Sequence, residues 1–193
     1  MYELFFKKFN EKVLLTTEEQ DLVQQYLAPK KLRKKQYLLQ EGDICKNICF
    51  VEKGALKAYV LDDTGEEHIT AFALEGWTMG DLASFMKQEP ATLNIDALED
   101  CELILISKQA HDELLERLPK YQIYIRMLMT DAYMALQKRT TNMISLSLDD
   151  RYFALTQMYP NIVQRVPQHM IASFMGLSPE TLSRIRSRSG TKR

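Results

Sequence analysis

The sequence predicts an α+β fold: an antiparallel β-roll (a double-stranded β-helix), one long helix, and a C-terminal winged-helix or helix-turn-helix domain. Glycines recur at nearly constant intervals between residues 42 and 80. From Pro119 onward, apolar residues follow helical spacing. Closer to the C-terminus, the composition is that of two short helices joined by a tight turn. The predicted boundaries are a β-roll at 1–118, a long helix at 119–141 and a helix-turn-helix domain at 142–193.

The composition is that of an ordinary globular protein. The 193 residues are 46% hydrophobic and 26% charged, enough for one large domain or two modest ones. The longest apolar runs, such as 103–106, are too short to cross a bilayer, and no secretory signal begins the chain. No membrane partner is therefore expected. Cys45, Cys49 and Cys101 fit a reducing, cytoplasmic location, and we expect small buried side chains rather than metal ligands.

The glycine spacing predicts the strands of the β-roll. Gly42, Gly54, Gly65 and Gly76 lie 12, 11 and 11 residues apart, with β-branched and aromatic runs between them. The turn composition of residues 62–65 predicts a hairpin between the runs that flank it. Regular turns of this kind favour an antiparallel roll over alternating strands and helices. The expected elements are strands at 48–51, 55–61, 68–74, 92–98 and 102–107, and a short helix at 81–87.

The region from Lys108 is predicted to be helical. A short helix at 108–117 ends before Pro119, and the long helix follows. The long helix carries three apolar stripes, so more than one of its sides must be covered. One cover is the β-roll; the second is either another copy of the chain, which makes a homodimer, or more of the same monomer. The stripe expected at the dimer contact is Tyr121, Ile125, Leu128, Ala132 and Ala135; the others are Ile123, Met127, Thr130 and Met134, and Met129, Tyr133 and Leu136.

Residues 166–188 predict a helix-turn-helix. Ala172, Gly176 and Leu182 have the spacing that the motif needs: a small residue where the helices touch, a glycine in the turn, and an apolar residue that closes the small core. Ser178 is placed to cap the second helix, and the proline after it suits the first helical turn. Before the motif, the sequence predicts a hinge at 142–149 and a helix at 150–159.

The outward face of the second helix of this motif suits nucleic acid. Its side chains are donors and acceptors that match base edges and phosphates. Residues 164–193 hold six basic residues against one acidic residue (+5), whereas 75–102 hold one basic against seven acidic residues (−6). Basic charge concentrated on one segment favours phosphate contacts, so double-stranded DNA is the expected partner. The candidate DNA-binding residues are Gln168, Ser178, Glu180, Thr181, Ser183, Arg184 and Arg188.

The order of β-roll, long helix and helix-turn-helix resembles the Crp/Fnr superfamily of bacterial transcription regulators. The resemblance covers nearly the whole chain and rests on residues 37–43, 50–59, 76–81 and 177–184. The last segment is the most specific, because Glu180, Ser183 and Arg184 match the Glu-x-x-Ser-Arg run of the family's recognition helix. The resemblance implies a β-roll like a cyclic-nucleotide-binding domain and a homodimer joined along the long helix. It also implies a palindromic DNA operator, and it allows RNA polymerase as a further partner.

The same resemblance locates an effector pocket. Cyclic-nucleotide members of the family hold the phosphate in a cassette that begins Gly-Glu and ends Arg-Ser. This chain has Gly80-Asp81 at the start but Ala91-Thr92 at the end, eleven residues on. The missing arginine removes a charge-assisted contact worth roughly 1.5–3 kcal/mol, or about 10–150-fold in affinity, so cyclic AMP is disfavoured. The pocket residues, for another small-molecule effector or for none, are Gly80, Asp81, Leu82, Ala91 and Thr92.

Other cofactors and other functions have less support. Iron–sulfur members of the family carry an N-terminal cysteine cluster, and residues 1–44 contain no cysteine. His68, His111 and His169 stand alone in the sequence, so no haem ligand is indicated. No phosphate-loop, serine-hydrolase or metalloprotease motif occurs, which argues against an enzyme. The sequence therefore predicts a DNA-binding transcription regulator; the alternative is a ligand sensor that acts through protein contacts.

Overall fold

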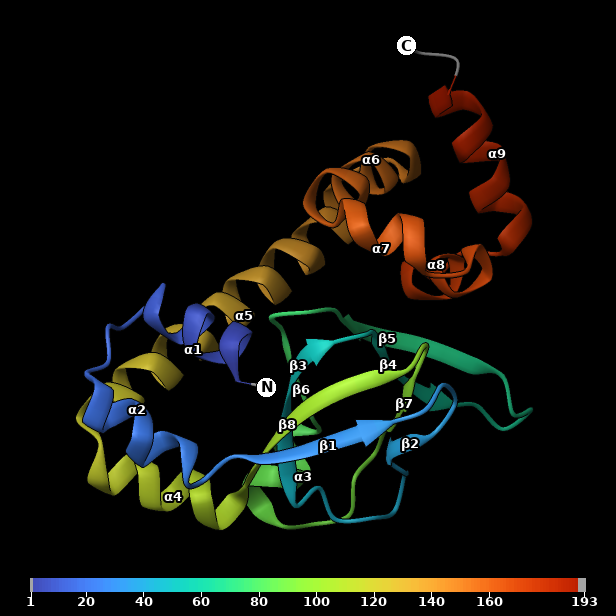
Figure 1. The fold of residues 1–193 in the computed structure, drawn as a ribbon. Helices are drawn as coiled ribbons and strands as arrows, with labels where there is room; N and C mark the ends of the chain where they lie inside the picture. Colours follow the sequence, from blue (N-terminus) through green and yellow to red (C-terminus); the bar gives the residue numbers. More distant parts are fainter. Residues whose placement is uncertain (1, 191–193) are drawn as a thin grey trace.

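The computed structural model describes residues 2–190, with side chains for residues 2–188 (Figure 1). Its strands form two four-stranded antiparallel sheets that enclose a common core, as the sequence predicts. One sheet has the order β1 (Ala28–Leu32), β8 (Cys101–Ser107), β3 (Asn47–Lys53), β6 (Thr78–Met79). The other has the order β2 (Tyr37–Leu39), β7 (Asn94–Ala97), β4 (Leu56–Leu61), β5 (Glu67–Ala73). The short helix α3 (Leu82–Lys87) follows β6.

The turns of the roll form where the sequence predicts them. Asp62 organises the β4–β5 hairpin, because its Oδ1 accepts hydrogen bonds from the N–H groups of Thr64 (2.8 Å) and Glu66 (3.0 Å). Gly54 links β3 to β4 with a φ of +102°, and a Cβ there would lie 2.6 Å from the Sγ of Cys101. Only glycine fits this link without displacing its neighbours.

The three cysteines are buried in the roll, which confirms that they act as small apolar residues. All three belong to the core between the sheets. Burial raises the pKa of the Cys49 thiol to about 12, so this thiol stays protonated at neutral pH. Among the described residues, no three His, Cys, Asp or Glu side chains are grouped to hold a metal ion.

Three helices pack at one end of the roll, around the beginning of α5 (Pro119–Ser145) (Figure 1). They are α1 (Glu3–Asn10), α2 (Thr17–Gln24) and α4 (Lys108–Arg117); only α4 is predicted from the sequence. Phe9 of α1 stacks on Tyr124 with ring centroids 3.9 Å apart, and the Tyr121 hydroxyl lies 3.0 Å from Nδ1 of His111. The first turns of α5 are therefore part of the core of their own subunit.

The long helix continues past its predicted end at residue 141. It runs to Ser145 because no proline or glycine interrupts residues 142–145. The predicted hinge at 142–149 shrinks to Leu146 and Ser147. The Ser147 hydroxyl then begins the next helix by accepting a hydrogen bond from the Asp150 N–H (3.2 Å). The hinge is thus two residues long.

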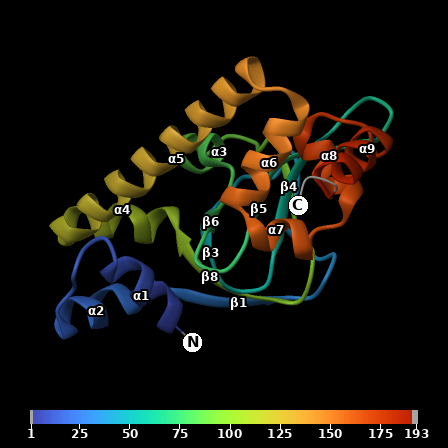
Figure 2. The same cartoon turned by 90° about the horizontal axis from the view of Figure 1, so that it is seen from above.

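The C-terminal domain consists of α6 (Leu148–Met158), α7 (Pro160–Arg165), α8 (Gln168–Met175) and α9 (Pro179–Gly190). The structure describes only helices between residues 148 and 190, so the winged variant of the prediction is not found in this range. The domain lies beside the roll, with α8 against β5 and α9 farther from the sheets (Figures 1 and 2). No helix in the described part of the chain is long and apolar enough to cross a membrane.

Candidate DNA-reading surface and effector sites

Helices α8 and α9 form the helix-turn-helix that the sequence predicts. Ala172 is fully buried where the two helices meet, and Leu182 and Ile185 of α9 close the small core. Gly176 ends α8 with a φ of +69°, and the N–H of Leu177 donates to the carbonyl of Ala172 over 2.9 Å. This left-handed cap fixes how α9 leaves the turn, and it favours glycine at this position.

Ser178 and Thr181 hold the start of α9. The Ser178 Oγ accepts a hydrogen bond from the Thr181 N–H (3.3 Å), as predicted for a cap, and lies 3.1 Å from the Thr181 hydroxyl. Because both hydroxyls have a partner inside the chain and Thr181 is half-buried, these residues position the helix. A contact of either one with DNA stays a prediction.

Glu180, Ser183 and Arg184 are exposed on one side of α9. At 100° per residue, this side lies opposite the buried pair Leu182 and Ile185. Hydrogen bonds from its own N–H and from the Ser178 hydroxyl hold the pKa of Glu180 below its ordinary value, and Arg184 contributes less. The carboxylate is therefore an ionised acceptor beside a cation one helical turn away. The structure brings together the three residues that match the family's recognition run.

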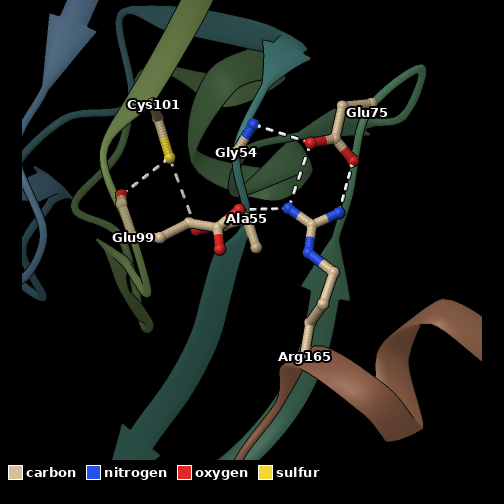
Figure 3. A network of polar contacts seen from close by, with 6 residues as sticks. All are labelled: Gly54, Ala55, Glu75, Glu99, Cys101 and Arg165. Carbon is tan, nitrogen blue, oxygen red and sulfur yellow. Dashed lines mark hydrogen bonds and ion pairs between the residues drawn. The ribbon is translucent and has the colours of Figure 1, made fainter.

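Two arginines that were counted as basic charge facing DNA have acidic partners in the chain. Arg188 lies 3.2 Å from an Asp149 oxygen, across α9 and α6. Arg165 points from α7 toward the roll, where it donates to both oxygens of Glu75 (2.6 and 3.0 Å) and pairs with Glu99 (Figure 3). The count of +5 is therefore wrong as a measure of the charge available to phosphates, because sequence separation hid these partners. Lys192 and Arg193, also in that count, lie outside the described residues.

Gln168 differs from the other predicted DNA contacts. It begins α8 and is half-buried, and its Oε1 is buried without a hydrogen-bond partner among the described atoms. A buried amide oxygen without a partner is costly, so the side chain is held here by packing. Its contact with DNA stays a prediction, and such a contact would use the amide nitrogen unless the side chain turns.

The C-terminal domain docks on the roll through α8. The Ser173 hydroxyl accepts from the Ile69 N–H (3.0 Å) and donates to the Glu67 carbonyl (3.0 Å), both on β5. Since β5 is an edge strand, Ser173 satisfies backbone groups that the sheet leaves open. Arg139 of α5 donates to a third group on this edge, the Thr70 carbonyl (2.8 Å). These hydrogen bonds join β5 to the helix that supports α9.

The stripe of α5 that the sequence predicts for the dimer is covered at its N-terminal end and exposed at its C-terminal end. Tyr121 is buried, and Ile125 and Leu128 are half-buried against their own subunit. Ala132 and Ala135 are exposed, as expected for a contact surface. The physical reason is α1 and α4, which cover the predicted stripe at its N-terminal end. The exposed large side chains come from the other two stripes: Ile123, Met127, Met129, Tyr133, Met134 and Leu136.

In the predicted effector cassette, the carboxylate of Asp81 accepts hydrogen bonds from backbone N–H groups of the chain. Asp81 is only 6% exposed; its Oδ1 accepts from the Ser84 N–H (3.0 Å) at the start of α3, and its Oδ2 accepts from the Thr92 N–H (3.0 Å). Ala91 is buried and donates its N–H to the Asp43 carbonyl (2.8 Å). The structure thus brings Asp81, Ala91 and Thr92 together, but as a closed internal network. Leu82, by contrast, points into solvent.

A cavity of about 330 Å³ opens between the sheets beside this cassette. Of the five predicted pocket residues, only Gly80 lines it, and a Cβ on Gly80 would lie 2.5 Å from the Cδ1 of Ile48. The cavity has two lysines and one aspartate at its walls. Its lining residues are Lys30, Leu38, Leu39, Asp43, Ile44, Cys45, Lys46, Asn47, Gly80, Ile95 and Leu105.

Sequence reasoning missed a buried charged group on the outer side of the second sheet. Lys57 is 5% exposed, pairs with Glu67 and lies 3.6 Å from an Asp96 oxygen and 4.2 Å from the Tyr59 ring centre. Burial raises the pKa of Asp96 above its ordinary value, although the charge of Lys57 opposes the shift. The sequence does carry a signal for this group, because Lys57 stands in the middle of an otherwise largely apolar strand run. The group lies on the sheet against which the C-terminal domain packs.

Comparison with known proteins supports the resemblance seen in the sequence. Residues 29–118 match the cyclic nucleotide-binding domain family. The chain is 28% identical to the transcriptional activator protein anr of Pseudomonas aeruginosa, over 90% of this chain and 75% of that protein. It is 31% identical to the transcriptional regulatory protein btr of Bordetella pertussis, over 72% of this chain and 62% of that protein.

The fold has a solved counterpart in FixK2 from Bradyrhizobium japonicum. The two structures superpose with a TM-score of 0.71 over 86% of this chain and 85% of that one, at 18% sequence identity. At that identity, the likeness concerns the fold. The sequence relatives are named as regulators, and together with the fold they support the resemblance of the chain to the Crp/Fnr family of transcription regulators.

Proposed function

We propose that the protein binds double-stranded DNA in the cytoplasm as a homodimer and reads its operator with α9. The observation that carries the proposal is the exposed row Glu180, Ser183 and Arg184, opposite the buried Leu182 and Ile185. Arginine recognises the O6 and N7 of guanine, and glutamate accepts from the N4 of cytosine. Arg186, which is exposed and belongs to no ion pair between described residues, supplies a phosphate contact.

The proposed homodimer forms along the exposed apolar side of α5. Tyr133 is 67% exposed and Met134 is 53% exposed. Large apolar side chains exposed along a long helix are a usual mark of a protein–protein contact. Pairing of two α5 helices would present two copies of α9 to successive major grooves about 34 Å apart, which fits a palindromic operator.

Any effector of the roll is proposed to be something other than cyclic AMP. The donors that would receive a phosphate, the N–H groups of Ser84 and Thr92, are occupied by the carboxylate of Asp81. A cyclic phosphate would meet this negative charge at a position where Ala91 offers no cation. The neighbouring cavity between the sheets, with Lys30 and Lys46 in its wall, remains the place in the roll for a different ligand.

Selection of bound duplexes from a random pool tests the proposal, followed by fluorescence anisotropy on the selected site. We expect a palindromic consensus, and we expect Arg184→Ala to remove about 1–3 kcal/mol of preference for it while weak, salt-sensitive binding persists. Lys34→Ala, an exposed cation on the roll, is the matched control and should change neither property. Equal loss on all sequences would contradict base reading by Arg184.

The dimer is tested separately by sedimentation equilibrium. A buried charge at an apolar contact is strongly unfavourable, so Met134→Glu should give a folded monomer with operator affinity reduced at least tenfold. Glu116→Gln, which changes an exposed side chain of α4, serves as the control. A Met134→Glu protein that stays dimeric would place the subunit contact elsewhere.

A further inference from the structure

A second cavity, of about 340 Å³, lies at the junction of the two domains and is separate from the space inside the roll. Its walls come from β5, the last turns of α5, α6, α7 and α8. Aromatic contacts join these elements around it: Trp77 meets Tyr159 edge-on at 5.1 Å, and Phe72 packs on Phe174 at 5.4 Å. A volume of this size is in the range of small-molecule pockets.

The charges around this cavity are all positive. Lys138, Arg139 and Arg151 line it together with apolar, aromatic and uncharged polar residues, and no aspartate or glutamate is among the lining residues. Arg139 donates to the carbonyl of Thr70 (2.8 Å), and its guanidinium lies 4.1 Å from the Phe174 ring centre. Arg151 donates to a carbonyl of Met175 (2.8 Å). Carbonyl dipoles satisfy single N–H groups but leave the net charge in place.

The uncompensated positive charge at this cavity is energetically unfavourable. Burial lowers the pKa of Arg139 below its ordinary value, and the nearby charge of Arg151 lowers it further. Taking a cation out of water without a counter-charge is unfavourable, and a bound anion removes that cost through charge-assisted hydrogen bonds. The exposed side of α5, where a second copy of the chain is expected, is apolar at Met134 and Leu136, and the one acidic residue of α5, Asp131, is paired with Lys12.

We propose that this junction cavity binds a small organic anion, an aromatic or aliphatic body with one carboxylate or sulfonate group. The apolar body lies among Trp77, Leu155 and Phe174, and the anionic group lies between Arg139 and Arg151. Because the walls belong to both domains, the occupied cavity holds α8 against β5. Binding does not depend on the proposed DNA reading; only its consequence for DNA affinity rests on that function.

The probe for this site is 8-anilinonaphthalene-1-sulfonate, an aromatic sulfonate, with uncharged N-phenyl-1-naphthylamine as its matched counterpart. Both are titrated into the full chain without DNA. Trp77 is the single tryptophan of the sequence and lines the cavity, so energy transfer from it reports on nearby probe. We expect one sulfonate probe per subunit, bound at least tenfold more tightly than the uncharged one, because a charge-assisted contact carries about that factor.

Variants distinguish the cavity from other apolar surface. Arg151→Gln should weaken the sulfonate probe about 10–100-fold and change the uncharged probe less than twofold. Arg126→Gln, an exposed cation on α5 outside the cavity, is its control. Ala154→Phe fills the cavity and should abolish binding of both probes, whereas Gln157→Phe, on the exposed side of the same helix, should not. Circular dichroism confirms that each variant is folded.

Three results would overturn the proposal. In the first, Arg151→Gln and Arg126→Gln weaken the sulfonate probe equally, so the effect is one of overall charge. In the second, a folded Ala154→Phe protein still binds the probe at one per subunit. In the third, the native protein excludes the probe and Ala154→Phe changes its oligomeric state, so a second copy of the chain occupies the cavity. Because no assay contains DNA, failure here is distinct from failure of the proposed DNA reading.

Discussion

The cassette around Asp81 and the cavity between the domains differ in charge: the first contains a carboxylate of the chain, and the second contains cations. In the cassette, two backbone N–H groups that would suit a phosphate are occupied by a carboxylate of the same chain. In the junction cavity, Arg139 and Arg151 donate to backbone carbonyls, and no carboxylate is among the described residues that line the site. One site carries its own anion; the other lacks one.

The difference shows why fold alone does not identify a ligand site. An internal carboxylate competes with an external anion at no cost in association entropy, so it disfavours phosphate binding at the same N–H groups. The cavity has the reverse property, since its uncompensated cations select for negative charge and its aromatic walls select for an apolar body. Two sites within one subunit therefore differ in accessibility because of a few side chains.

The largest expected effect comes from removing the internal anion. Asp81→Ala deletes the cap of α3 and leaves the N–H of Thr92 without a partner, so we expect the free energy of unfolding to fall by about 2–4 kcal/mol. Urea denaturation followed by circular dichroism measures it. Asp63→Ala, an exposed aspartate in the β4–β5 turn, should change stability by less than about 0.5 kcal/mol.

The same variant also sharpens the comparison of the two sites. If the carboxylate of Asp81 holds the anion position, inorganic phosphate or sulfate should raise the melting temperature of Asp81→Ala more than that of the native protein. A native-like stability for Asp81→Ala would mean that water satisfies these N–H groups, and the cassette would then be open rather than closed.

Much of the fold follows from local signals that the sequence carries. The hairpin around Asp62, the turn at Gly176 and the cap at Ser178 form as predicted, because each depends on residues within a few positions of one another. The recognition run on α9 is correctly placed for the same reason. Helix ends were less predictable: α5 exceeds its expected end because nothing in residues 142–145 breaks a helix.

What the sequence could not supply is the pairing of residues far apart along the chain. From the sequence alone, Arg165 counts as a positive charge available to phosphates. In the fold, Glu75, ninety positions away, accepts hydrogen bonds from its guanidinium. From the sequence alone, Tyr121 is predicted as a dimer contact, but in the fold α1 covers it. Each error comes from tertiary burial, which helical periodicity does not encode.

Arg165 is an intermediate case, a cation at the domain junction that does have carboxylate partners. Arg165→Ala removes its contacts with Glu75 and Glu99, and we expect a loss of about 1 kcal/mol at neutral pH because the group is partly exposed to solvent. Burial alone would raise the pKa of Glu75, but hydrogen bonds from Arg165 and from the Gly54 N–H bring it below its ordinary value.

The pH dependence of this loss follows from that shift. A carboxylate whose folded pKa is lowered stabilises the fold above its unfolded pKa, and the contribution disappears as the pH falls through the folded value. The stability difference between native protein and Arg165→Ala should therefore be complete at neutral pH and shrink below pH 4.5. Thermal melts across this range measure it, with Arg33→Ala as an exposed control. A difference independent of pH would assign the effect to packing.

The smallest effect is expected at the exposed pair of Arg188 and Asp149, where solvent already screens both charges. Asp149→Asn should change stability by less than about 0.5 kcal/mol. It releases Arg188, however, so the salt dependence of operator binding should steepen by up to about one counterion per subunit. Asp63→Asn removes the same charge from the distant β4–β5 turn and should leave the salt slope unchanged. Equal slopes for the two variants would show that Arg188 does not reach a phosphate, because only overall charge would then matter.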